Sequence, residues 1–306
     1  MGIFRDYESA GSGIAKNAPK KEGFALFIDL LGRKLWKLLE LNLLYFIFFI
    51  PLYLIFPALT IIKNGRIFTG VSFFLVFVFM VLIGPATAGM MKVQRAFYIE
   101  KHTFVARDFF KAVKANFKKA SVIGFIDCII ALSAIASINV YPTLAVIEGT
   151  KLMYIPMVIT FSLFLTVAIM NFYIFLMLIA TNLSLKDLFK NSFALAFLGM
   201  KQNIIAFAVS AVLTVGMYLL LKFAFPLFMM VIPFFPSAFM FFVICFVCYP
   251  VIQKYVINPY YAGKGEINPE LINDSENVDE ETLFKDMGGK EKPIEKRSKG
   301  KGKRIS

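Results

Sequence analysis

The sequence predicts an all-α membrane protein, a polytopic bundle of six transmembrane helices with amphipathic helices on its cytoplasmic side. Hydrophobic residues fill 58% of its 306 positions and charged residues only 17%, and its mean hydropathy is +0.71. Soluble domains contain about 45–50% apolar residues, so lipid must solvate much of this chain. The charges also leave six long segments almost uncharged, and lysine and arginine gather in alternate connections.

Each charge-poor segment is long enough to cross a membrane, because a spanning helix needs about 20 apolar residues. None alternates between apolar and polar residues as a barrel strand would. The segments are residues 41–62, 67–91, 121–147, 152–185, 202–221 and 223–253. The last segment contains four prolines, which predict a kinked or broken final span: Pro226, Pro233, Pro236 and Pro250.

The positive charges predict the orientation. Only four of the 33 lysines and arginines fall on one side of the predicted bundle: Lys63, Arg66, Lys151 and Lys222. Since positively charged loops stay in the cytoplasm, we expect a multi-pass protein of the cell membrane with both termini cytoplasmic.

Three parts follow from this reading. Residues 1–37 form a cytoplasmic N-terminal segment with an amphipathic helix, and residues 38–261 form the six-span domain. Residues 262–306 form a charged cytoplasmic tail, whose low apolar content predicts disorder.

Residues 103–120 predict an amphipathic helix on the cytoplasmic surface. Apolar residues recur there at helical spacing, and four cations repeat that spacing on a neighbouring face: Arg107, Lys111, Lys114 and Lys118. Such a helix suits an anionic leaflet. We interpret these cations as membrane-surface or partner contacts; the alternative is that they only mark topology.

A second surface helix is expected over residues 184–200, opened by a capping box of Ser184 and Asp187. Residues 107–111 read R-D-F-F-K and residues 186–190 read K-D-L-F-K. With residues 27–37 as a third copy, the sequence suggests three weak repeats, each an amphipathic helix followed by two spans.

Several local patterns resemble the YesL-type family of bacterial integral membrane proteins. They are Met1 to Phe4, Asn42 to Tyr45 leading to Pro51, Gly84 to Ala88, Phe109 to Lys111, and Asn116 to Ala120, within roughly residues 1–250. The resemblance implies a small multi-spanning protein, typical of Gram-positive bacteria and often encoded beside carbohydrate-uptake and glycan-degradation genes. The family's activity is undefined, so the resemblance implies no catalytic residue.

A run of small residues around a proline marks the second span. Gly84, Pro85, Ala86 and Ala88 are candidates for a kink or for close packing of helices. A static kink in a tight helix crossing and a hinge or polar lining both remain open.

Polar groups within the spans are few. Asp127 is the only charged residue inside them, and a buried carboxylate requires a partner or a wet cavity. A lysine at the cytoplasmic end, Asn171 and Thr181 are its candidate partners. We expect a structural hydrogen bond, with ion or proton coupling as the alternative. Asn42, Asn139 and Asn171 suit hydrogen bonds between helices.

The composition leaves little for catalysis. One histidine, three cysteines and a single intramembrane acid do not provide paired acids or an activated nucleophile. We therefore expect no enzyme, no catalytic residue, no cofactor and no metal site, and we interpret Cys128, Cys245 and Cys248 as apolar fillers.

The functional expectation is an integral membrane component of a transport system for carbohydrate uptake, acting as a non-catalytic accessory or scaffold subunit. A small transporter or channel in its own right is the alternative. The expected partners are the lipid bilayer and subunits of a sugar transporter, and not nucleic acid.

Overall fold

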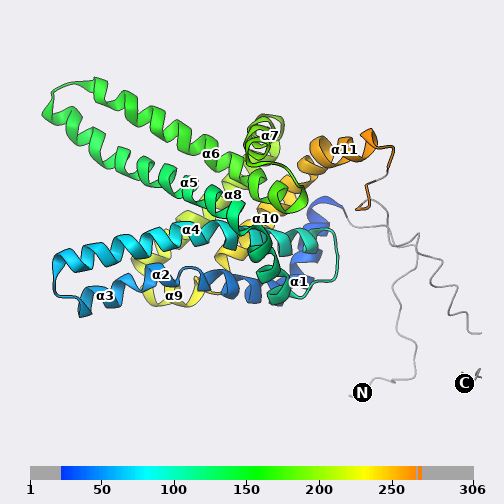
Figure 1. Cartoon of the computed structure of the whole chain (residues 1–306), viewed down its shortest axis with the longest axis horizontal. Helices are drawn as coiled ribbons and strands as arrows, with labels where there is room; N and C mark the ends of the chain where they lie inside the picture. The colour runs from blue at the N-terminus through cyan, green and yellow to red at the C-terminus, as the bar shows by residue number, and fades with distance from the viewer. Residues whose placement is uncertain (1–21, 267, 271–306) are drawn as a thin grey trace, which may run out of the picture. The chain divides into compact units, whose positions relative to one another are not determined.

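The computed structural model describes residues 22–266 and 268–270, and this part of the chain is helical throughout, with no β-strand (Figure 1). Of the described residues, 22–256 belong to one compact unit, and a second unit begins at Ile257. The first unit contains ten α-helices: α1 (Gly23–Ile47), α2 (Ile50–Tyr53), α3 (Ile55–Ile61), α4 (Gly65–Tyr98), α5 (Val105–Ile147), α6 (Tyr154–Ala180), α7 (Leu185–Leu198), α8 (Met200–Phe223), α9 (Phe225–Val231) and α10 (Pro236–Ile252).

The second unit is described only in its first residues. It contains α11 (Asn258–Gly263), and Asn268 donates a hydrogen bond to the side-chain oxygen of Asn258 at 2.8 Å. Most of the charged tail predicted for residues 262–306 lies outside the described residues, as do residues 1–21.

The structure confirms a polytopic helical bundle. Five helices, beginning at Gly65, Val105, Lys151, Met200 and Pro236, are long and apolar enough to cross a membrane. The helix α1 and residues 50–61 meet at an angle of 56° and are together long and apolar enough for one further span, so the described residues hold five to six candidate spans.

Prolines divide two of the predicted spans. In the last span α9 ends at Val231 and α10 begins at Pro236, which confirms the predicted break. The first span is also divided, although no break was predicted there. Pro51 cannot bond the carbonyl of Ile47, where α1 ends, and Pro57 cannot bond that of Tyr53, where α2 ends.

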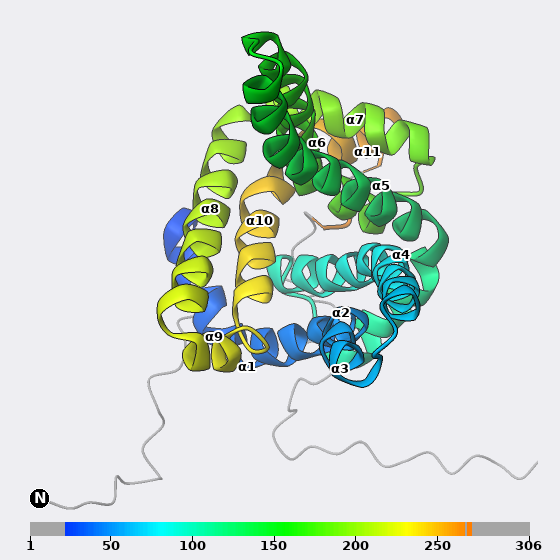
Figure 2. The ribbon, with the colours of Figure 1, turned by 90° about the vertical axis from the view of Figure 1, so that its left-hand side faces the viewer.

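Three helices form the centre of the bundle. The inner helices α4, α6 and α10 contact one another, and each outer helix lies against two of them (Figure 2). The outer helix α1 contacts α10 and α4, α5 contacts α4 and α6, and α8 contacts α6 and α10. The chain thus places an outer helix and then an inner helix three times, in the order that the weak sequence repeat suggests.

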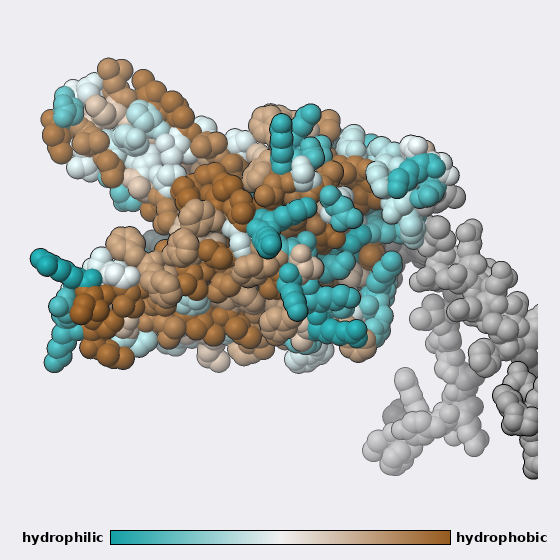
Figure 3. Space-filling model, viewed as in Figure 1, coloured by the Kyte–Doolittle hydropathy of each residue, from teal (hydrophilic) through white to brown (hydrophobic). Residues whose placement is uncertain are grey.

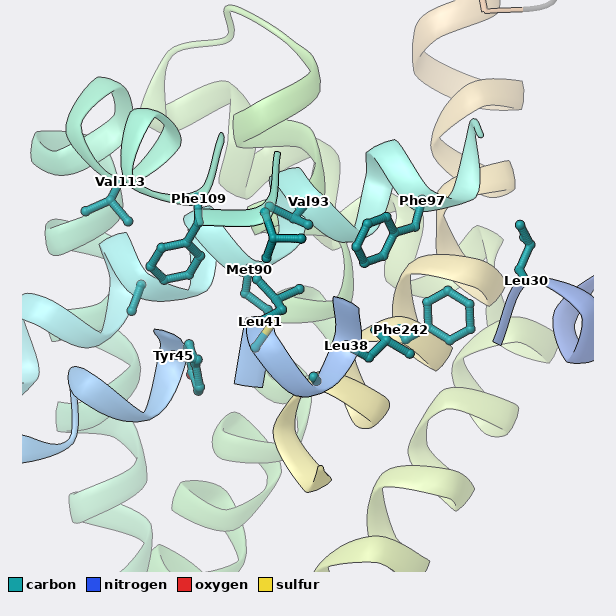
Figure 4. Packing of buried hydrophobic residues seen from close by; sticks show 13 residues of the cluster. Leu30, Leu38, Leu41, Tyr45, Met90, Val93, Phe97, Phe109, Val113 and Phe242 are labelled. Atoms are coloured by element: carbon teal, nitrogen blue, oxygen red, sulfur yellow. The ribbon is translucent and has the colours of Figure 1, made fainter. Parts of the chain in front are cut away.

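The core occupies one end of the bundle. We call it the basic end: α1, α5 and α8 begin there, α4, α6 and α10 end there, and it carries most of the lysines and arginines of the described residues. Leu38 and Leu41 of α1 pack there with Met90 and Phe97 of α4 and Phe242 of α10 (Figure 4).

The opposite end, the hairpin end, is more open. It carries Lys63, Arg66, Lys151 and Lys222. Figure 3 shows the tip of the α5–α6 hairpin separated from that of α3–α4, with apolar residues over much of both. Apolar side chains such as Ile135, Val146 and Ile155 are exposed there, as expected of surface that contacts lipid.

The structure corrects one predicted element. The surface helix expected over residues 103–120 is not separate but forms the first turns of α5, one continuous helix of 43 residues. At ~1.5 Å per residue it is about 65 Å long, roughly twice the ~30 Å hydrocarbon thickness. No proline or glycine interrupts it before Gly124. The second surface helix is separate, as predicted: it is α7, with Ser184 as its N-cap.

Candidate functional site

Asn42 bridges the break between α9 and α10. Its side-chain amide donates to the carbonyl oxygen of Ile232 at 3.1 Å, and its Oδ1 accepts from the backbone N–H of Ala238 at 2.7 Å. The residue is 1% exposed. A carbonyl at the end of α9 and an N–H in the first turn of α10 have no partner within a helix, because the helix is interrupted between them. The side chain of Asn42 on α1 forms a hydrogen bond with each of them.

A second amide holds the same segment from α4. Gln94 is fully buried and donates from Nε2 to the carbonyl oxygen of Ala238 at 3.0 Å. Its Oε1 is buried without a hydrogen-bond partner in the described part of the chain. Sequence reasoning missed Gln94 because it lies between Lys92 and Arg95, beyond the predicted end of the span.

A small cavity of about 60 Å³ adjoins the Asn42 side chain. It is lined by Asn42, Tyr45, Phe46, Phe49, Tyr53, Ile232 and Ser237, so both proline-divided spans meet at it. A water molecule occupies about 30 Å³ in the liquid, and pockets for small organic ligands measure about 300–1,000 Å³. This cavity therefore matches one or two waters and is too small for a sugar.

The predicted small-residue run lies where α4 crosses α5. Gly84, Pro85, Ala86 and Ala88 are all buried, and α4 continues through Pro85 without a break. A side chain on Gly84 would collide with the backbone carbonyl of Ala120, and a Cβ on Gly124 would lie 2.6 Å from the backbone nitrogen of Gly84. The two backbones touch, and only glycine allows this approach.

Asp127 lies one turn beyond that crossing, and its carboxylate pairs with the side chain of Asn171 on α6. Of the candidate partners, the structure places Asn171 there. The Oδ1 atoms of both residues are buried without a hydrogen-bond partner among the described residues. The pair joins α5 to α6, as expected of an interhelical hydrogen bond within the hairpin.

Asn139 does not join another helix. It is exposed, and its amide donates to the carbonyl oxygen of Ile135 in its own helix at 2.7 Å. The interhelical hydrogen bond expected for Asn139 is therefore corrected. Asn139 lies on the exposed side of α5, whereas Ala134 and Ser137 of the same helix are buried. Its amide therefore faces away from α6 and is satisfied one turn back in its own helix.

The four cations of the predicted basic face lie on one exposed side of α5. Arg107, Lys111, Lys114 and Lys118 are all exposed, whereas Phe109 and Val113 on the opposite side are buried. A Cβ on Gly89 of α4 would lie 2.8 Å from Val113 and 2.9 Å from Phe109. The cations are therefore presented by a helix that is packed firmly against the core.

A polar corner that the sequence did not suggest joins α6, α7 and α8. The Tyr173 hydroxyl donates to Oδ1 of Asn203 at 2.6 Å, and Nδ2 of Asn203 donates to the carbonyl oxygen of Ala196 at 2.7 Å. A side chain on Gly199 would collide with the same hydroxyl. Tyr173 stands in a long apolar run, so only the polar Asn203 near the start of the fifth span was a signal.

Another pair joins α4 to α10 at the basic end. The guanidinium Nε of Arg95 donates to the Tyr249 hydroxyl at 2.6 Å, and its charge lies 5.3 Å from the centroid of that ring. Tyr249 is fully buried, so this contact fixes Arg95 at the edge of the core.

The remaining reactive groups do not assemble into a site in the described residues. No three histidine, cysteine or acidic side chains come together there as metal ligands would. Cys245 and Cys248 are buried free thiols within α10, and His102 packs against the ring of Phe104.

Comparison with protein families finds a match to part of the chain. Residues 38–139 resemble a family described as Protein of unknown function, DUF624. Comparison with curated proteins finds no match, and comparison with solved structures finds none either. The matched segment contains Asn42, the glycine crossing of α4 and α5, the exposed basic face and Asp127, so an uncharacterised family shares the region that holds these features.

Proposed function

We propose that this chain is a non-catalytic accessory or scaffold subunit of a membrane transport system, of the YesL-type and serving carbohydrate uptake, with its basic end in the cytoplasm. The observation that carries the proposal is the exposed basic face of α5. Four cations project from a helix that extends about 24 Å, at ~1.5 Å per residue, ahead of the charge-poor segment that begins at residue 121. Rigid, exposed charge of one sign favours a partner of complementary charge.

The orientation is testable by itself. A periplasm-type reporter fused after Ser306 should be inactive, and the same reporter inserted between Lys63 and Arg66 should be active, because the basic end is retained in the cytoplasm. Activity at Ser306 would reverse the topology and reject the proposed cytoplasmic role.

The partner is testable by affinity purification from gentle detergent. Subunits of a transporter should co-purify with the wild-type chain and be lost from Lys111→Gln/Lys114→Gln/Lys118→Gln. The matched control is Lys63→Gln/Arg66→Gln/Lys151→Gln, which removes equal charge at the hairpin end and should keep the partners. If the first variant is inserted correctly and retains the same subunits, the basic face is not the contact.

A transporter in its own right is the second candidate. It is favoured by the meeting of two proline-divided spans at Asn42, since many transporters place ion and substrate sites at discontinuous helices. The cavity size restricts such a cargo to a small ion or water. Purified protein in liposomes would have to carry a labelled small cation, and Asn42→Ala would have to abolish the flux.

A further inference from the structure

The short helix α7 presents a mixed cationic and aromatic face. Lys186 and Lys190 are exposed, and Phe193 and Phe197 are 49% and 60% exposed, with ring centroids 5.0 Å apart. At 100° per residue these four positions fall within about 60° of one another on the helix. The face opposite them is buried: Leu188, Ser192 and Leu195.

The ends of α7 are fixed, so the face is preorganised. At the N-terminus, the backbone N–H of Asp187 donates to the Ser184 hydroxyl at 3.2 Å, and that hydroxyl donates to the Asp187 carboxylate. At the C-terminus, the Asn203 side chain holds the carbonyl of Ala196. Lys119 of α5 donates to the carbonyl oxygen of Leu183 at 2.8 Å, which holds the turn before α7.

Chain connectivity sets the depth of α7 in the membrane. It joins the end of α6 at Ala180 to the start of α8 at Met200, so it lies at the level where two spans leave the bilayer. Figure 1 shows α7 end-on, running across the axes of α5 and α6, and Figure 2 places it at the edge of the bundle. Its outward face therefore meets the lipid–water boundary.

We propose that α7 is an interfacial helix that binds anionic phospholipids. Phe193 and Phe197 enter the acyl-chain boundary, and Lys186 and Lys190, with the exposed Lys201 at the start of α8, contact the headgroup phosphates. The pattern of bulky apolar rings beside lysines on a helix in the interface plane is the one that favours anionic lipid. Asp187 keeps its negative charge while it caps the helix start, about 90° around the helix from the centre of this face, so the three lysines leave the surface net positive. The inference does not depend on the proposed function, because it concerns lipid and not a protein partner.

A single tryptophan can report the contact. Trp36 is the only tryptophan in the chain, so Trp36→Phe/Phe197→Trp places the sole fluorophore on α7. The full-length chain is reconstituted in vesicles that contain brominated phosphatidylglycerol or brominated phosphatidylcholine at equal mole fraction. We expect brominated phosphatidylglycerol to quench more strongly, with a relative association constant higher by on the order of fivefold for each contributing lysine.

Variants separate headgroup binding from simple exposure to lipid. Lys186→Gln/Lys190→Gln should remove the preference for phosphatidylglycerol while leaving quenching by both lipids. Lys63→Gln/Arg66→Gln should keep the preference. Equal quenching by the two lipids in the parent would overturn anionic selectivity, and absence of quenching by either would overturn the interfacial placement. If the Phe197→Trp chain elutes abnormally, Phe193→Trp replaces it as the reporter.

Discussion

The first turns of α5 and the whole of α7 begin alike and end differently. Phe109 and Leu188 occupy equivalent positions of the sequence repeat, and both are fully buried. Asp108 and Asp187 both accept hydrogen bonds near the helix start, from the backbone N–H of Phe104 and from the Ser184 hydroxyl. Yet α5 continues to Ile147, whereas α7 stops at Leu198.

The neighbouring inner helix accounts for the difference. In the repeat, Ala120 and Gly124 of α5 correspond to Gly199 and Asn203. The residue of α4 that lies against the first pair is Gly84, so the backbone of α5 contacts the backbone of α4 and α5 continues past it. Against the second pair α6 presents Tyr173, whose hydroxyl fills the space beside Gly199 and binds Asn203. Two similar sequences therefore become a continuous helix and a corner, and they differ both in this residue pair and in the side chain that the inner helix places against it.

The largest expected effect is at the glycine crossing. Gly84→Ala should destabilise the protein by ~3 kcal/mol or more, because the new Cβ must push two backbones apart. Thermal unfolding in detergent measures it. The control is Gly216→Ala in α8, where a Cβ meets nothing within 4 Å, and the better helix propensity of alanine should raise stability by up to ~1 kcal/mol. Equal changes in stability for the two variants would contradict a close backbone contact at Gly84.

A double-mutant cycle tests the α7–α8 corner. Gly199→Ala should cost ~2 kcal/mol, because its Cβ collides with the Tyr173 hydroxyl. In the Tyr173→Phe background that hydroxyl is absent, so the same substitution should cost less, with a coupling of ~1 kcal/mol in unfolding free energy. Strict additivity of the two changes would show that Tyr173 does not determine the corner.

Asp127 tests how α5 is held to α6 beyond the crossing. Asp127→Leu removes the bond to Asn171 and should cost ~1 kcal/mol, the usual range for one interhelical hydrogen bond. Asp127→Asn keeps size and hydrogen bonding and should unfold at nearly the wild-type temperature. The structural interpretation fails if Asp127→Asn abolishes function at matched expression while its thermal stability is unchanged.

The smallest effect is expected at the cap of α7. Ser184→Ala should cost ~0.5–1 kcal/mol, because α7 loses its N-cap acceptor. Hydrogen exchange of the amides in its first turn should increase, whereas those at the start of α5 should not change. If both helix starts respond equally, α7 is not an independent unit.

Charge distribution alone was sufficient to predict a polytopic helical bundle and to place its five continuous apolar helices, because a charge inside a span is costly wherever the helix faces. The break at α9–α10 was also predictable from its density of prolines. The break after Ile47 was not, since single prolines such as Pro51 are tolerated in many spanning helices. The sequence alone does not show which of the carbonyls freed by proline will receive a hydrogen bond from a neighbouring helix.

Side-chain pairing was harder to predict than the spans. Asn171 was one of several candidates for Asp127, and the choice depends on the rotation of α6 about its axis. Asn139 was assigned to a helix contact, but its side chain lies on the exposed side of α5 and bonds its own helix. Gln94 and Tyr173 were missed because each bonds a segment far along the chain, and no local spacing records such a contact.

The unequal ends of the bundle also bear on bilayers of different thickness. Hydrophobic mismatch is relieved by tilting or bending helices, at a fraction of a kcal/mol per ångström. The buried contacts of α4, α6 and α10 are concentrated at the basic end, so the α5–α6 hairpin tip can tilt without opening them. In a thin or thick membrane the tip therefore absorbs the change, while α7 and the basic face of α5 keep their positions.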